Sequence, residues 1–189
     1  MPFLHPALDA AAGKLAPLRA AAIRIGAPDP IAALYQIDCS PQAIRESART
    51  LSTGRDVLVT ARLEFERGAH SAERRWGGEP AAEFRGRADE LDVHYRQAAE
   101  VAARTAAVGL DLADLLDRLA QQTATQVLSI AEATTPATEA ILSGDRTAEA
   151  AYRIRTACTT ITEAVTHGVT TITEATTFLD PFTTPVLPN

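Results

Sequence analysis

The chain has 189 residues and a formal net charge of −6, with 46% hydrophobic but only 5% aromatic residues. This length suits one domain with a buried core. The acidic balance disfavours nucleic-acid binding, which needs a basic face, and disfavours an anionic membrane surface as the main partner. Because much of the apolar share is alanine, we expect an all-α protein, an elongated helical bundle with closely spaced helices.

The beginning of the sequence carries no recognisable export signal. Residues 1–6 lack the basic start and the apolar segment of a signal peptide. No stretch of the sequence is both apolar and long enough to cross a bilayer, so we expect no integral membrane segment. Export, if it occurs, is therefore expected without a cleavable signal peptide.

Residues 1–40 have the pattern of broken helices. Pro6 can open a helix that Gly26 ends, and Pro17 inside this pattern predicts a kink or a split. Asp29-Pro30 reads as the N-cap and first residue of a second, shorter helix. We expect this region to pack on the rest of the bundle.

A long amphipathic helix is predicted to begin at Ser40-Pro41. Its apolar residues recur every three or four positions: Ile44, Ala48, Leu51, Leu58, Phe65, Ala69, Ala72 and Trp76. Arg55 and Arg62 interrupt this stripe, so the predicted seam is imperfect.

The stretch Trp76-Gly77-Gly78 separates this helix from a second long one. Two successive glycines permit positive φ and end a helix, and Pro80 suits the first turn of the next helix. We therefore predict an antiparallel hairpin that turns at residues 76–79. The second helical pattern continues to Thr135-Pro136.

The sequence leaves the continuity of the second helix open. Gly109 is a place for a bend, and Gln121-Gln122-Thr123 is a place for a break. If residues 80–134 form one helix, it spans about 80 Å, against about 50 Å for residues 41–75. The part of the second helix that extends beyond the first would then need to pack against another segment.

A threonine-rich last helix is predicted from about Arg146 to Phe178. It has a seam of heptad spacing: Ile154, Cys158, Ile161, Val165, Gly168, Ile172, Ala175 and Leu179. We expect this seam to pack against residues 112–134, because both segments carry few charges. The prolines that follow Asp180 predict an irregular tail.

Four regions result from these patterns. They are broken N-terminal helices over 1–40, a helical hairpin over 41–120, additional helices over 121–180 and an irregular tail over 181–189.

The hairpin with Trp76-Gly77-Gly78 at its turn resembles the WXG100 superfamily, the small helical substrates of type VII (ESX) secretion. The order of elements resembles the PPE-type branch of that superfamily, although the N-terminal Pro-Pro-Glu of that branch is absent. The resemblance covers roughly residues 41–120. It implies a helical hairpin fold and a role for Trp76 and Gly78 as half of a composite export signal.

The other half of that signal, Tyr-x-x-x-Asp/Glu, is absent from this sequence. Tyr35, Tyr95 and Tyr152 are followed four positions later by residues that are not acidic. The resemblance thus implies a helical partner protein, in a hetero- or homo-oligomer, that supplies this half, and recognition by a secretion ATPase or a chaperone. A purely structural role for Trp76, packed over the helix ends, is equally compatible with the sequence.

No residue pattern indicates catalysis, a cofactor or a metal. The histidines His5, His70, His94 and His167 are far apart, and the spacing of Cys39 and Cys158 is no zinc pattern. We expect both cysteines to be free, buried thiols. Two acidic rows are interpreted as solvated helix faces: Asp89, Glu90 and Asp92, then Asp111, Asp114 and Asp117.

Two functions from different classes fit the sequence. The first is a non-enzymatic type VII secretion substrate or export-linked interaction protein, secreted or held in the cell envelope. The second is a cytosolic helical scaffold or adaptor in which Trp-x-Gly is fortuitous. The two differ in whether Trp76 is a recognition surface or only a packing residue.

Overall fold

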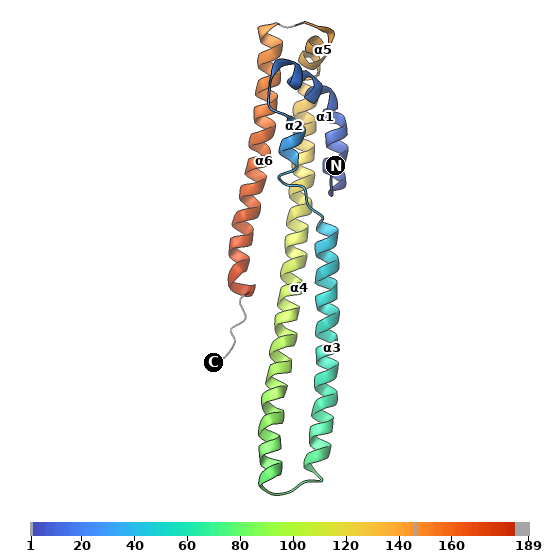
Figure 1. The fold of residues 1–189 in the computed structure, drawn as a ribbon, viewed down its shortest axis with the longest axis vertical. Helices are drawn as coiled ribbons and strands as arrows, with labels where there is room; N and C mark the ends of the chain where they lie inside the picture. The colour runs from blue at the N-terminus through green and yellow to red at the C-terminus, as the bar shows by residue number, and fades with distance from the viewer. Residues whose placement is uncertain (1, 146, 184–189) are drawn as a thin grey trace. The chain divides into compact units, whose positions relative to one another are not determined.

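The computed structural model describes residues 2–145 and 147–183. Within them the protein is all-α, as the sequence predicts, and has six helices (Figure 1). These are α1 (Pro6–Ile25), α2 (Pro30–Leu34), α3 (Pro41–Glu73), α4 (Glu79–Ala133), α5 (Thr135–Ser143) and α6 (Ala148–Thr183). The chain divides into two compact units, which we call the hairpin unit (residues 42–111) and the core unit (residues 1–41 and 112–178).

In the hairpin unit, α3 and the first part of α4 run antiparallel (Figure 1). α3 ends at Glu73 and α4 begins at Glu79, so the predicted hairpin and its turn are confirmed. Gly78 has a φ of 82°, a backbone conformation that residues with a side chain rarely adopt. This conformation helps the chain to reverse its direction at the turn.

The buried residues of the seam between the two hairpin helices are small. Ala48, Ala81, Ala99 and Ala106 are its buried apolar residues. A Cβ added to Gly109 would lie 3.3 Å from the Cβ of Ala48, so Gly109 allows a close approach of the helices. α4 continues through this residue as one helix of 55 residues, which resolves the continuity that the sequence left open.

The interruption of the apolar stripe at Arg62 has a structural reason. Arg62 Nε donates to Asp92 Oδ1 across the hairpin at 2.5 Å, and Arg96 Nε lies 3.0 Å from Asp92 Oδ2. The hydrogen bond from Arg62, helped by the positive charges of Arg62 and Arg96, holds the pKa of Asp92 below its ordinary value. Arg55 instead pairs with the adjacent Asp56 on the exposed surface.

The core unit contains the large buried side chains of the chain. They come from α1, α2, α4, α5 and α6: Leu8, Leu15, Leu34, Val127, Ile141, Ile154, Ile161 and Val165. Gly26, which is left-handed, ends α1, as the sequence predicts, and the left-handed Gly144 ends α5 in the same way. Asp29 caps α2 by accepting from the backbone N–H groups of Ile31 and Ala32.

Pro17 does not split α1, so the split that the sequence allowed does not occur. α1 runs unbroken over Pro6–Ile25. Because Pro17 has no N–H, the carbonyl of Gly13 loses its helical partner, but both residues are exposed and water can donate to this carbonyl. Leu15 and Leu18 are buried on either side of Pro17, and their packing holds the helix together.

The seam of α6 lies inside the core unit. Ile154, Cys158, Ile161 and Val165 are buried in the same cluster as Ala120, Ala124 and Val127 of α4. Ile172 is partly buried against that cluster. α6 extends to Thr183, past the predicted end at Phe178, and residues 184–189 of the predicted tail lie outside the described residues.

The segment that precedes α1 is held by side chains distant in sequence. The Asp38 carboxylate accepts the backbone N–H groups of Leu4 and His5 at 2.9 and 3.0 Å. The ring of Phe3 stacks on Tyr35, with centroids 4.2 Å apart. These contacts tie the first residues to the segment that follows α2.

Candidate functional site

The hairpin turn presents an accessible indole. Trp76 is 60% exposed, and its ring meets the ring of Phe84 edge-on, with centroids 5.8 Å apart. Within the described residues, the indole N–H has no hydrogen-bond acceptor. Gly77 and Gly78 beside it are exposed and unobstructed except for Pro80, which lies 3.8 Å from a Cβ built on Gly78. The turn therefore leaves one face of the indole open to another molecule.

Charged side chains flank this indole. An ion pair between Arg85 and Glu73 joins the two helices beside the turn. Arg74 and Arg75 are exposed and make no side-chain interaction with any described residue. The turn thus combines an aromatic ring with two guanidinium groups whose donors are free to bind acceptors on a partner.

Large apolar residues of the hairpin unit remain partly in solvent. The most exposed among them, between 39% and 62%, are Leu51, Val57, Leu63, Leu91, Val93, Val101 and Leu110. Leu51, Leu58 and Phe65 recur every seven residues and so follow one stripe of α3. The exposed apolar side chains are distributed over both helices of the hairpin unit, so each helix carries apolar surface that another chain could cover.

The predicted seam of α6 offers no such face. Four of its residues are fully buried by helices of the same chain: Ile154, Cys158, Ile161 and Val165. The structure therefore assigns these four residues to the interior of the core unit.

The polar residues near the start of α1 form a satisfied cluster. His5 is 4% exposed, its Nδ1 accepts from the N–H of Ala7, and its Nε2 lies 2.9 Å from Asp117 Oδ1. His70, His94 and His167 are exposed. Among the described residues, no three His, Cys, Asp or Glu side chains are placed to hold a metal ion.

Both cysteines are free thiols, as the sequence predicts, but only Cys158 is fully buried. Burial raises the pKa of Cys158 to about 11, with a contribution from Asp29. Partial burial also raises the pKa of Cys39, and Asp38 and Asp117 add to this effect. Neither thiol is activated as a nucleophile, because nucleophilic cysteines have lowered pKa values.

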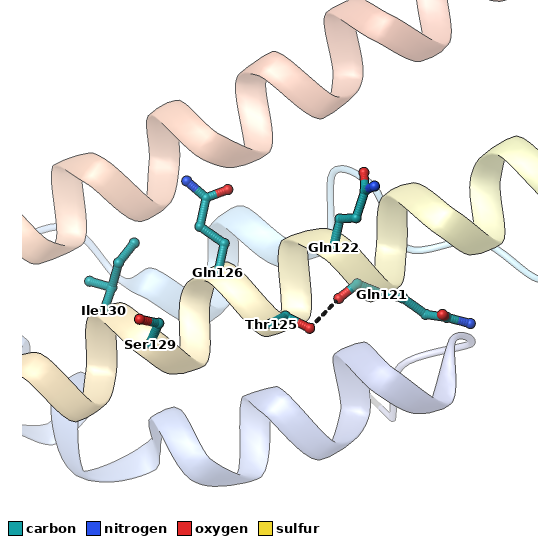
Figure 2. Close-up of a pocket in the computed structure, with 6 residues that line it drawn as sticks. All are labelled: Gln121, Gln122, Thr125, Gln126, Ser129 and Ile130. Atoms are coloured by element: carbon teal, nitrogen blue, oxygen red, sulfur yellow. Dashed lines mark hydrogen bonds between the residues drawn. The ribbon is translucent and has the colours of Figure 1, made fainter.

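A hollow of about 530 Å³ lies along α4 in the core unit (Figure 2). Figure 2 shows Gln122, Gln126 and Ile130 on the side of α4 along which α6 runs. The hydroxyl of Thr125, on the floor of this hollow, donates to the carbonyl of Gln121 at 2.9 Å. The lining carries no charged side chain, and its uncharged polar groups form no acid–base arrangement.

Comparison of the chain with models of known families, with curated proteins and with solved structures finds no match. A search of the described helices for membrane-spanning segments finds none that is long and apolar enough. The geometry of the chain itself therefore carries the functional argument.

Proposed function

We propose that this chain is a non-enzymatic helical interaction protein of type VII secretion, either a substrate or an export-linked partner, recognised through Trp76-Gly77-Gly78. On this proposal it is secreted or held in the cell envelope and needs no cleavable signal peptide. A secretion ATPase or a chaperone recognises the turn by binding to it. The single observation that carries the proposal is the exposed indole of Trp76 at the turn of an antiparallel helical hairpin.

The exposure of Trp76 favours recognition over packing. An indole that only joined the helix ends would gain most by full burial, since apolar stabilisation grows with the area removed from water. Trp76 instead leaves more than half of its surface in solvent and meets Phe84 in a T-shaped contact. Exposed tryptophan and arginine are the residue types that contribute most to binding at protein interfaces.

Exposed apolar side chains of the hairpin support a helical partner. Leu51, Leu91 and Val101 are each at least 39% exposed on helices that are long enough to pack along a second pair of helices. Burial of these side chains supplies the apolar free energy of association. On this proposal the partner also supplies the missing Tyr-x-x-x-Asp/Glu half of the export signal.

The test is secretion of folded variants from a host with a type VII system, with the partner co-expressed. Trp76→Ala and Gly78→Ala are expected to block export while the helical circular dichroism spectrum stays unchanged. Tyr152→Ala is the matched control, because Tyr152 is an aromatic residue of similar exposure, 66%, on α6. Normal export of both turn variants would refute the proposal and leave the cytosolic scaffold or adaptor as the function.

A further inference from the structure

A small cavity that is partly open to solvent lies between three helices of the core unit. Its volume is about 210 Å³, and its walls come from α1, α4 and α5. Apolar side chains form most of the wall, among them Pro17, Leu18, Leu128 and Leu142. An apolar protein cavity of about 150 Å³ is known to hold benzene, so this cavity has room for a slightly larger molecule.

One wall of the cavity carries a buried hydroxyl without a partner. Thr138 is 5% exposed, and among the described residues its Oγ1 is the only fully buried side-chain polar atom that makes no hydrogen bond. Other helical threonines donate to a carbonyl of the preceding turn, as Thr134 does to Ile130 and Thr162 does to Cys158. An unbonded buried hydroxyl costs free energy, so this position favours a molecule that can bond to it.

The hydroxyl of Thr138 reaches the cavity by a simple motion. Threonine in a helix has two favourable χ1 rotamers. A step of about 120° in χ1 can move the hydroxyl to the place of the methyl group while the methyl takes the place of the hydrogen, and Thr138 already lines the cavity. The hydroxyl can therefore face a ligand without movement of the backbone.

Charges at the edge of the cavity select the kind of ligand. Lys14, Glu132 and Glu139 line it and are exposed, and none of them forms an ion pair with a described residue. Two carboxylates against one ammonium group favour a cationic ligand over an anionic one.

We propose that this cavity binds a small primary amine with a compact apolar body, of about the size of benzylamine. The apolar body packs against Leu18, Leu128 and Leu142. The ammonium group donates to the Oγ1 of Thr138 and is attracted by the carboxylates of Glu132 and Glu139. This site does not depend on the proposed role in secretion.

The test is titration of the full chain with benzylamine, benzyl alcohol and benzoate, followed through backbone amide NMR shifts. Benzylamine is expected to give saturable shifts at Leu18, Leu128 and Thr138, with an affinity about tenfold above that of benzoate. Thr138→Val is expected to lower the benzylamine affinity by about tenfold, the effect of one lost hydrogen bond to a charged group. Thr125→Val is the matched control, because that hydroxyl is exposed and bonded to its own helix.

Three results would overturn the proposal. The first is an absence of saturable shifts with all three compounds, which would mean that water alone fills the cavity. The second is benzylamine binding that Thr138→Val leaves unchanged. The third is equal affinity for benzylamine and benzoate. If Thr138→Val does not fold, Ala131→Leu is tested in its place, because a leucine at this position fills the cavity. Unchanged benzylamine binding in Ala131→Leu would also overturn the proposal.

Discussion

Nε2 of His5 lies 2.9 Å from Oδ1 of Asp117, although 112 positions separate the two residues. The other ring nitrogen, Nδ1, accepts from the N–H of Ala7 and so caps α1. In the neutral ring these two bonds require that the proton sits on Nε2 and is donated to Asp117. The imidazole of His5 therefore caps α1 and bonds to α4 at the same time.

Replacing His5 by alanine is expected to lower the free energy of unfolding by about 1–3 kcal/mol. The change removes the cap of α1 and leaves Asp117 without its bond from the imidazole. Urea unfolding measures the loss, and His94→Ala is the control because His94 is exposed. Equal stability of the two variants would show that the His5 bonds do not stabilise the fold.

Ile161→Ala is expected to lower the free energy of unfolding by about 2–5 kcal/mol, the usual range for truncation of a fully buried isoleucine. Ile161 has no exposed surface and belongs to the cluster that joins α6 to α4. An exposed position two residues away provides the control, since Thr159→Ala should stay within about 0.5 kcal/mol. A loss below that limit for Ile161→Ala would place this side chain outside the core.

Local signals allowed much of the fold to be predicted from the sequence. Pro41 and Pro80 mark the starts of long helices, and the first helix ends before Gly26, which can adopt a left-handed conformation. The heptad spacing from Ile154 to Val165 also identified the buried face of α6, because helical periodicity depends only on nearby residues.

Contacts between distant residues could not be predicted in this way. Arg62 interrupts an apolar stripe, and no local pattern reveals that its partner is Asp92, thirty positions away. The same holds for the Asp38 carboxylate on Leu4 and for the unbonded hydroxyl of Thr138, both of which depend on how separate helices pack. The position of the candidate site at the turn could be predicted from Trp76-Gly77-Gly78. The exposure of the indole could be seen only in the structure.

Acid is expected to weaken the hairpin unit through Asp92. Because Arg62 lowers the folded-state pKa of Asp92, the unfolded chain binds this proton first as the pH falls. The stabilisation by this carboxylate is therefore present above its ordinary pKa, near 4, and is lost as the pH falls through the lowered value. Chemical unfolding measured between pH 7 and pH 3 should show a steeper loss for the native chain than for Asp92→Asn. If stability falls equally with pH in both chains, the ion pair does not contribute to the stability of the fold.

The two thiols are expected to react at different rates. At pH 8 the half-buried Cys39 should be alkylated by iodoacetamide first, and the fully buried Cys158 should react only after unfolding. Because burial raises the pKa of Cys158 from 9.0 to about 11, the unfolded chain loses this proton first as the pH rises. Its contribution to stability therefore falls between these two pH values. Mass spectrometry after timed alkylation checks the order, and modification of Cys158 before Cys39 would contradict it.

The glycines of the hairpin are expected to respond differently to alanine. Both Gly54 and Gly109 lie within helices, where alanine is favoured over glycine by about 1 kcal/mol. A Cβ at Gly54 meets nothing within 4 Å, so Gly54→Ala should raise the free energy of unfolding by up to about that amount. At Gly109 the new methyl group would lie 3.3 Å from the Cβ of Ala48, and crowding in the seam should offset the gain. Thermal and urea unfolding of both variants measure the difference, and an equal gain at the two positions would show that the helices of the hairpin do not approach closely at Gly109.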